Sequence, residues 1–335
     1  MSNNRRNTTI IFPDFHLESA IKRALRLQNG PITTTVLKKL QHLSINDRTV
    51  SSLKGLENAI NLRTLSIPQH NLLSLQPLTA LNKLTNLTIH LNETVTPKLL
   101  SPLIKLTDLQ LKAVGDQDIE PLGCLLELRR LSLDNAMIQN IQPIAVLPYL
   151  KVFDLNRPVL PEKGHIELPE NLNELRITRA KLSNLNQFTI PKDLISLNLN
   201  NNHISDLEVL SRSPGLVNLE LEANDIDNIK NLSSLHDIIW LRLGHNRITD
   251  LNPLTSLPEL SNLDLSHNNI TDLTPLVRLH KLTWLGLAFN DLRDLSPLHS
   301  LSKLSYIDIE GISGDNKRGE NTLSKMTRRG VQVNK

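Results

Sequence analysis

Cysteine, glycine and aromatic residues are scarce in this chain of 335 residues. The one cysteine, Cys124, excludes an internal disulfide and any zinc site built from cysteines alone. No apolar run reaches the roughly 18 residues needed to cross a bilayer, so we expect no membrane span. The first residues include two arginines but only a short apolar stretch before Pro13, which is too little for a signal peptide. We therefore expect a cytoplasmic protein, unless an unconventional export route operates.

Leucine is what the chain has in excess, with 69 of its 335 residues. Hydrophobic residues reach 39% and charged residues 21%, which is too apolar a composition for intrinsic disorder. An apolar content held mainly by one side-chain shape indicates repetition. Repetition with a period of roughly 20 to 50 residues takes precedence over any estimate of domain number from length.

The repeat is 22 residues long, and its first position is leucine or isoleucine in all thirteen copies, without insertion or deletion. These first positions are Leu40, Leu62, Leu84, Leu106, Leu128, Leu150, Leu172, Leu194, Leu216, Ile238, Leu260, Leu282 and Leu304. Chance does not produce such a register. The chain is therefore expected to fold as a stack of equivalent units.

Residues 260–281 show one complete repeat, LSNLDLSHNNITDLTPLVRLHK. Leu263 and Leu265 alternate as in a short β-strand. The later apolar residues recur every third position, as in 3₁₀ turns, and they are Ile270, Leu273, Leu276 and Leu279. Neither segment buries its leucines alone, so neighbouring repeats must stack. The pattern predicts an α/β solenoid of horseshoe shape, with a parallel β-sheet on the concave face and 3₁₀ or short helical turns on the convex face.

This pattern resembles the leucine-rich repeat family, and its 22-residue form is similar to that of bacterial internalins and of a eukaryotic phosphatase regulatory subunit. The resemblance implies a right-handed solenoid of bacterial origin. Residues 11–40 resemble the internalin N-terminal cap, with Asp14 placed to cap a helix from about Phe15 to Leu27. Residues 321–333 resemble the helix and strand that close such arrays. We assign three parts to the chain: an N-terminal helical cap (1–39), twelve repeats (40–303), and a last partial repeat with a C-terminal cap (304–335).

Position 9 of the repeat is normally an asparagine whose amide pairs with the loop backbone of adjacent repeats. We expect such an amide ladder at Asn92, Asn202, Asn224, Asn246, Asn268 and Asn290. We expect it to be missing where other residues stand at this position, namely Arg48, His70, Val114, Ala136, Pro158 and Ala180. Repeat 150–171 departs most, because its prolines favour an extended loop over compact turns. A bend in the array and simple sequence drift are the two interpretations of that repeat.

The sequence contains none of the motifs that mark nucleotide-binding, hydrolase or zinc-protease sites. We therefore predict no enzymatic activity, no cofactor, no metal and no small-molecule substrate. Cys124 lies between framework residues Leu122 and Leu125, which favours a buried apolar role over that of a nucleophile. His245 and His267 share position 8 in neighbouring repeats and form a metal-like pair, but they lack a third ligand.

Acidic or amide side chains recur at position 13, immediately before the turns. A calcium site and a set of turn caps are the two interpretations of this column. The carboxylates can accept hydrogen bonds from the turn N–H groups, which favours the caps. The residues are Asp206, Asn228, Asp250, Asp272 and Asp294.

Positions 4 and 6 of each strand point into the core, so positions 3, 5 and 7 are expected to face solvent on the concave face. Both tryptophans, Trp240 and Trp284, stand at position 3, together with Tyr306, while Phe289 lies nearby at position 8. Tryptophan and tyrosine dominate interface hot spots, so we interpret this group as binding anchors. The alternative is that the rings pack on one another or under the C-terminal cap.

Charge changes sign along the chain. Residues 202–310 contain 8 Lys and Arg against 15 Asp and Glu, whereas residues 31–201 contain 18 against 15. The middle repeats carry a basic patch of Lys112, Arg130, Lys151, Arg157, Arg176 and Arg179. Both signs could steer a partner, or the charges could simply keep an exposed sheet soluble. Nucleic acid is the less favoured ligand, because the aromatics lie in the acidic segment.

These patterns favour a non-enzymatic module that binds a protein partner on the concave face, through Trp240, Trp284, Phe289 and Tyr306 with Arg242 and Asp264 as polar neighbours. The resemblance to internalins implies recognition of a host receptor. The resemblance to the phosphatase subunit implies an alternative, an intracellular regulatory subunit that occludes an enzyme. Binding of nucleic acid through the basic middle repeats is the third hypothesis.

Overall fold

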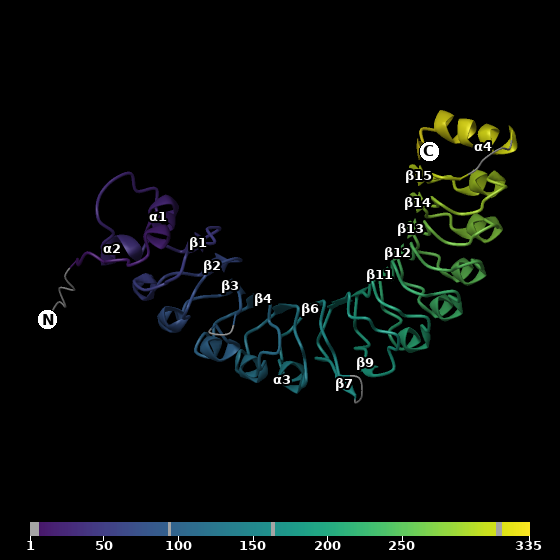
Figure 1. The fold of residues 1–335 in the computed structure, drawn as a ribbon. Helices are drawn as coiled ribbons and strands as arrows, with labels where there is room; N and C mark the ends of the chain where they lie inside the picture. Colours follow the sequence, from purple (N-terminus) through teal and green to yellow (C-terminus); the bar gives the residue numbers. More distant parts are fainter. Residues whose placement is uncertain (1–6, 93–94, 162–164, 313–316) are drawn as a thin grey trace. The chain divides into compact units, whose positions relative to one another are not determined.

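The structure is a computed structural model that describes residues 7–92, 95–161, 165–312 and 317–335. It divides into two compact units, Met1–Glu162 and Lys163–Lys335. Each unit is a stack of repeats, in which a short strand is followed by a turn segment. In the second unit the strands line one side of the stack and the turns line the other (Figure 1). The repeat count alone did not predict this division.

The first unit contains six parallel strands within the described residues, ordered β1-β2-β3-β4-β5-β6. Neighbouring strands pair one repeat apart, as Leu65 does with Leu87. Their bounds are β1 His42–Ser44, β2 Thr64–Ile67, β3 Asn86–His90, β4 Asp108–Lys112, β5 Arg130–Asp134 and β6 Val152–Asn156. The turns of this unit are η1 Leu56–Asn58, η2 Gln76–Ala80, η3 Pro97–Leu100 and η4 Glu120–Cys124, which are 3₁₀ helices, and the short helix α3 Gln142–Ala145.

The second unit has eight parallel strands within its described part, ordered β8-β10-β11-β12-β13-β14-β15-β16. They are β8 Glu174–Thr178, β10 Ser196–Asn198, β11 Asn218–Glu220, β12 Trp240–Arg242, β13 Asn262–Asp264, β14 Trp284–Gly286, β15 Tyr306–Asp308 and β16 Gln332–Asn334. Its 3₁₀ helices are η5 Glu208–Arg212, η6 Lys230–Ser234, η7 Asn252–Ser256, η8 Thr274–Arg278 and η9 Ser296–Ser300. A separate pair, β7 Ile166–Glu167 and β9 Phe188–Thr189, lies on the turn side of the first two repeats of this unit.

The predicted fold class is confirmed, because both units are leucine-rich repeat solenoids of parallel strands and short turns. The core follows the repeat: Leu260, Leu263 and Leu265, at positions 1, 4 and 6, are fully buried. The apolar residues at every third position, Ile270, Leu273, Leu276 and Leu279, are also buried. Side chains three residues apart lie on the same side of a 3₁₀ turn, so all four face the core. Burial of one leucine-rich stripe per repeat thus defines the whole architecture.

The N-terminal cap forms as predicted, although its helix is shorter. Helix α1, Phe15–Ala24, begins after Asp14, whose carboxylate accepts the Leu17 N–H and also the Ser51 and Ser52 N–H groups. It ends at Ala24, which is exposed, and not near Leu27. A short helix, α2 Thr34–Leu37, follows. Asp14 therefore fastens the cap helix to the first repeat and does not only cap it.

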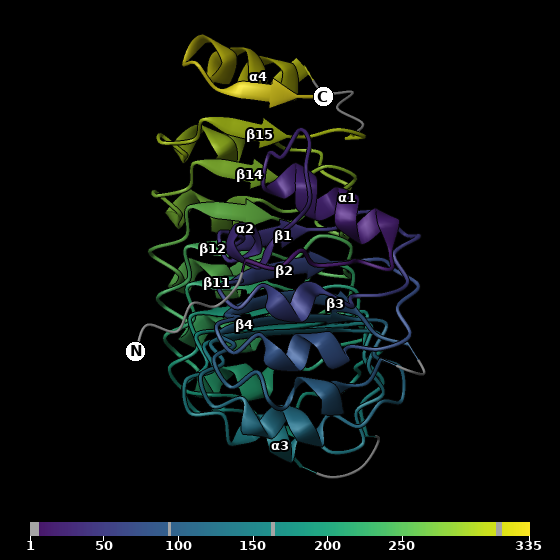
Figure 2. The same ribbon diagram turned by 90° about the vertical axis from the view of Figure 1, so that its left-hand side faces the viewer.

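The C-terminal cap consists of helix α4, Lys317–Arg328, and strand β16. Strand β16 pairs with β15 in parallel, and α4 lies across the end of the stack beside it (Figure 2). Gly330 follows the helix with φ +89°, a left-handed conformation that favours glycine. Met326 and Val331 are buried, so the cap covers the leucines of the last repeat.

The amide ladder of the second unit is confirmed. Asn268 is typical: its Nδ2 donates to the carbonyl oxygens of Leu243 and Leu265 at 2.9 and 3.0 Å, and its Oδ1 accepts the Ile248 N–H at 2.9 Å. The same pattern recurs at Asn224, Asn246 and Asn290. Each amide joins two repeats, which satisfies loop groups that the turn leaves unpaired.

In the first unit, other groups replace the missing amides. His70 stands at position 9, where its Nε2 donates to the His90 carbonyl oxygen at 2.7 Å and its Nδ1 accepts the Leu72 N–H at 3.0 Å. Around Ala136, backbone bridges to Gly115 and from Met137 to Val159 pair the loop groups directly. The amides are thus absent from these repeats as expected, and other groups pair with the loop backbone at His70 and around Ala136.

Repeat 150–171 departs from the 3₁₀ pattern as its prolines predict. The strand β7 replaces the compact turn, and Ile166 pairs with Phe188 of β9. Residues 162–164 of this segment lie outside the described residues, as do residues 1–6 of the N-terminal segment. The boundary between the two units falls within this repeat.

Candidate functional site

Most of the predicted anchors lie on the outer side of the second unit's sheet, here called the strand face, which carries positions 3, 5 and 7 of the repeats that contain β10 to β15. Along position 3 the strands pair Asn218 with Trp240, Trp240 with Asn262, Asn262 with Trp284, and Trp284 with Tyr306. The residue that follows each of them, at position 4, is a buried leucine or isoleucine. The sheet register therefore places the three large aromatics in one row, with Asn262 between the two tryptophans.

Two aromatic groups form in this row. Trp284 and Tyr306 stack in parallel, with ring centroids 5.6 Å apart and planes 7° apart. Trp240 is 37% exposed, and the guanidinium carbon of Arg242 lies 5.3 Å from its ring centroid. Cation–π contacts of this kind contribute about 0.5 to 1 kcal/mol at exposed sites. The rings are thus held in place on the sheet while keeping surface available to solvent.

Gly286 makes room for this arrangement, which sequence reasoning did not identify. A Cβ at Gly286 would lie 2.7 Å from Asp264 Oδ1 and 3.0 Å from Trp284 Cη2. It would also lie 3.0 Å from Ser266 Oγ. The indole therefore lies flat along its own strand, and the Asp264 carboxylate lies beside it. A glycine inside a strand often marks such a close approach, and this was the one signal that could have pointed to the site.

Phe289 belongs to a second stack at position 8. Its ring stacks on His267 at 4.4 Å between centroids, and His267 stacks on His245 at 3.9 Å. A Cβ at Gly311 would lie 2.5 Å from the Phe289 ring, so the other ring face is covered too. Phe289 is 45% exposed, and with both faces covered it offers its edge.

The same stack shows whether His245 and His267 could share a metal ion. The rings of His245 and His267 are nearly parallel, 13° apart, and present their faces to each other. A shared metal would need the ring nitrogens, which lie in the ring planes, to converge on one point. The stacked geometry therefore disfavours a metal between them. No group of three or more candidate metal-binding side chains occurs among the described residues.

The strand face is acidic. Asp264 Oδ1 accepts the Ser266 N–H at 3.0 Å. Glu220 accepts from Asn198 and Asn200, and Asp308 accepts from the Glu310 N–H and from Asn334. All of these partners are neutral donors. The carboxylates are therefore oriented without having their charge compensated.

The predicted basic patch falls in both units. Lys112, Arg130, Lys151 and Arg157 belong to the first, and Arg176 and Arg179 to the second. Three of the six are next to carboxylates: Arg157 lies 3.1 Å from Asp134, Arg130 3.6 Å from Asp108, and Arg176 3.6 Å from Glu174. Lys112 and Arg157 do line one pocket of about 360 Å³, together with His90 and Asp134. The structure thus brings two of these cations together, beside a carboxylate.

Two further sequence expectations have clear outcomes. Position 13 acts as a turn cap: Asp250 accepts the Asn252 N–H at 2.9 Å, and Asp272 accepts the Thr274 N–H at 2.8 Å. The expectation that Cys124 is buried is wrong, because its side chain is exposed. It ends the 3₁₀ helix η4, and it lies between Leu122 of that helix and Leu125 just after it, which both point inward.

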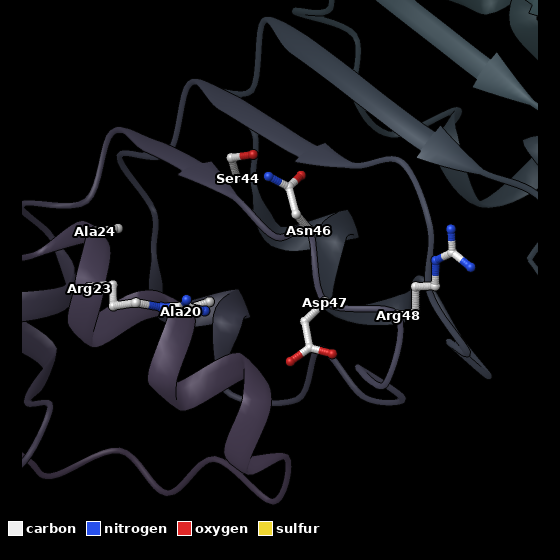
Figure 3. A pocket seen from close by; sticks show the side chains of 7 residues that line it. All are labelled: Ala20, Arg23, Ala24, Ser44, Asn46, Asp47 and Arg48. Atoms are coloured by element: carbon white, nitrogen blue, oxygen red, sulfur yellow. The ribbon is translucent and has the colours of Figure 1, made fainter.

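The first unit contains a pocket of about 800 Å³ between α1 and the end of β1. Ala20 and Arg23 of α1 face Ser44 and Asn46 across it, while Arg48 extends away from Asp47 (Figure 3). The Asp47 carboxylate is already bonded to Thr49 and His16, and these hydrogen bonds lower its pKa to about 2. The one carboxylate that lines this pocket is thus held ionised in contacts of its own, and it is a poor general base.

A family model for leucine-rich repeats (two copies) matches residues 238–278, which include Trp240, Arg242 and Asp264. The search of curated proteins finds no match. Among solved structures, the internalin InlF of Listeria monocytogenes is 24% identical with a TM-score of 0.69, and the match covers 99% of this chain and 98% of that one.

Two other structures are similar over part of their length. The functional domain of InlJ from Listeria monocytogenes is 21% identical, with 90% of this chain and 60% of that chain covered and a TM-score of 0.57. The plant peptide hormone receptor RGFR1, in complex with RGF2, is 20% identical, with 83% and 49% covered and a TM-score of 0.55. In the described part of the chain no helix is long and apolar enough to cross a membrane. The match to the family model and the similar solved structures show that the chain contains leucine-rich repeats and has the internalin-like leucine-rich repeat fold.

Proposed function

We propose that the strand face of the second unit binds a protein partner, with Trp240, Trp284 and Tyr306 as anchors and Arg242 and Asp264 as polar neighbours. Phe289 adds a ring edge at the border of this face. Leucine-rich repeats serve protein–protein interaction in general, and the fold supports that coarser assignment. The plant receptor of similar fold is in complex with RGF2, which supports a polypeptide as the ligand class.

The exposed indole of Trp240 is the observation that carries the proposal. The strand face needs no large apolar side chain for stability, because the leucines at positions 4 and 6 already fill the core. Exposed tryptophan is unfavourable in water and is strongly enriched at interface hot spots. Both tryptophans of the chain nevertheless stand in this one row.

The alternative hypotheses differ in how well the geometry supports them. A regulatory subunit that occludes an enzyme would use the same face, so it is a special case of the proposal. Nucleic acid binding through the middle repeats has less support, because three of the six cations lie beside carboxylates. We infer a non-enzymatic role, since the strand face offers aromatic rings and hydrogen-bonded carboxylates but no nucleophile activated by a neighbouring base.

The test is capture of partners from the cell's own cytosol and from a foreign lysate, with the tagged wild-type chain and a Trp240→Ala/Trp284→Ala variant side by side. The proposal predicts at least one protein that the wild type retains and the variant loses. Replacement of two hot-spot tryptophans by alanine should weaken binding by about 1,000-fold, taking about 2 kcal/mol for each.

Ile239→Ala serves as the matched control. Ile239 precedes Trp240 and is 42% exposed, but it stands at position 2, outside the strand face. The free energies of unfolding of all three proteins must agree within about 1 kcal/mol for the comparison to be valid. If wild type and double variant retain the same partners, or if Ile239→Ala loses them equally, the anchor assignment is wrong.

A further inference from the structure

We propose that the partner surface that docks on the strand face is basic, with lysine or arginine side chains that contact Asp264 and its neighbouring carboxylates beside the aromatic row. This inference rests on the proposed function, because it names the chemistry of the partner at the same face. It follows from the charges that the face presents, and from which of them are left without a counter-ion.

Positions 3, 5 and 7 of the repeats that contain β10 to β15 hold five carboxylates and one cation, Arg242. The carboxylates are Glu220, Glu222, Asp264, Asp308 and Glu310. They belong to the repeats of β11, β13 and β15, so Arg242 and Gly286 lie between the acidic positions of successive pairs of these strands. A sheet that needed only solubility would mix both signs, so this one-sided set indicates a partner of the opposite sign.

Ion pairs elsewhere on the molecule make the contrast sharper. On the flanks of the second unit, Asp225 pairs with Arg247, and Glu259 pairs with Lys281. Outside the strand face, Asp108 lies 3.6 Å from Arg130 and Glu174 lies 3.6 Å from Arg176. None of the five carboxylates of the strand face has a Lys, Arg or His nitrogen within 4.0 Å in the described part of the chain.

Arg242 forms no ion pair with the carboxylates on either side of it within 4.0 Å. It stands at position 5 between Glu220 and Asp264 on the adjacent strands. Its guanidinium lies over Trp240 instead, 5.3 Å from the ring centroid. The Asp264 carboxylate meanwhile lies between the backbone of Gly286 and that of Gly244, each of which lacks a side chain that would cover it. Asp264 therefore stays available to an incoming cation.

An aromatic row beside uncompensated carboxylates matches the two halves of a lysine or arginine side chain. The stem of such a side chain packs on an indole or phenol ring, and its charged end hydrogen-bonds a carboxylate. A phosphate backbone would be repelled by the same five carboxylates. A basic polypeptide surface is thus the class of ligand that this face fits.

The test is selection of a random peptide display library on the immobilised full-length chain, with the Trp240→Ala/Trp284→Ala variant as counter-selection. Peptides that bind the wild type and not the variant are sequenced, and their Lys and Arg content is compared with that of the unselected library. The inference predicts clear enrichment of Lys and Arg and depletion of Asp and Glu. It also predicts association rates that fall steeply as NaCl rises from 50 to 500 mM, as expected for steering by charge.

A pair of charge variants then locates the effect. Asp264→Asn should weaken the selected peptides about tenfold, because a charge-assisted hydrogen bond is lost. Glu259→Gln changes the net charge equally but lies off the strand face, and it should leave binding within about twofold. Asp264→Asn should also change the free energy of unfolding by no more than about 0.5 kcal/mol, since asparagine has the same shape and keeps an acceptor for the Ser266 N–H.

The outcomes separate the two proposals. Tryptophan-dependent peptides without Lys and Arg enrichment, or equal effects of Asp264→Asn and Glu259→Gln, would overturn the basic-partner inference and leave the proposed function standing. Peptides that bind wild type and double variant equally, or selection that yields no binder, would overturn the proposed function and the inference with it.

Discussion

Gly286→Ala is expected to disturb the aromatic row by adding one methyl group. The new Cβ would lie 2.7 Å from Asp264 Oδ1 and 3.0 Å from Trp284 Cη2, distances at which something must move. The backbone of Gly286 is not in the left-handed region, so the cost is purely steric. Overpacking of this kind costs about 1 to 3 kcal/mol, and the lower half applies here because the contacts are side-chain ends that can rotate.

The measurement combines unfolding with fluorescence. A Trp240→Phe background leaves Trp284 as the one tryptophan, so its emission reports the stack on Tyr306 directly. Gly286→Ala should lower the free energy of unfolding by about 1 kcal/mol and shift the Trp284 emission to longer wavelength as the ring leaves the sheet.

Gly215→Ala is the matched control, because a Cβ there meets nothing within 4 Å and its φ is ordinary. That variant should be neutral or up to about 1 kcal/mol more stable, since alanine restricts the unfolded chain. If Gly286→Ala behaves like Gly215→Ala, with unchanged emission and stability, then the close packing over Gly286 is wrong and so is the placement of Trp284.

Three further outcomes follow from the structure. Asn268→Ala should lower the free energy of unfolding by at least about 2 kcal/mol in urea titrations, because the Ile248 N–H and two carbonyl groups lose a buried partner, and a loss below about 0.5 kcal/mol would contradict the ladder. Burial lowers the pKa of His70 below its ordinary 6.5. As the pH falls below about 6.5, the unfolded chain therefore takes up a proton that the folded chain does not, and the free energy of unfolding should decrease toward pH 5. A His70→Asn variant whose stability has the same pH profile would refute this cause. Cys124 should react with a thiol reagent such as DTNB in the native protein, one thiol per chain, and reaction only after denaturation would show that the thiol is buried.

The repeat register could be predicted from the sequence because leucines recur at the same positions of successive repeats. A 22-residue period fixes which residues face the core, and hence the strands, the turns and the row that contains Trp240 and Trp284. The Asp14 cap and the asparagine ladder were also predictable, since each needs one residue type at one position. Each of these features depends on residue types at fixed positions, which the sequence shows directly.

Features that depend on where a side chain turns were not predictable. Trp284 bends along its strand over Gly286, and the Arg242 guanidinium lies over Trp240, choices that the period does not encode. His70 replaces an asparagine because an imidazole also offers one donor and one acceptor, which residue identity alone does not indicate. The exposure of Cys124 was missed because a thiol between two buried leucines can still lie on the outer side of a 3₁₀ turn.

Hydroxyl-radical footprinting of the chain with and without a tryptophan-dependent binding peptide tests the central claim most directly. If the strand face of the second unit is the docking surface, oxidation of Trp240 and Tyr306 should fall several-fold in the complex. Oxidation of Leu73 and Tyr149, exposed residues of the first unit, should not change. Protection of Leu73 or Tyr149 with Trp240 left fully reactive would contradict the claim.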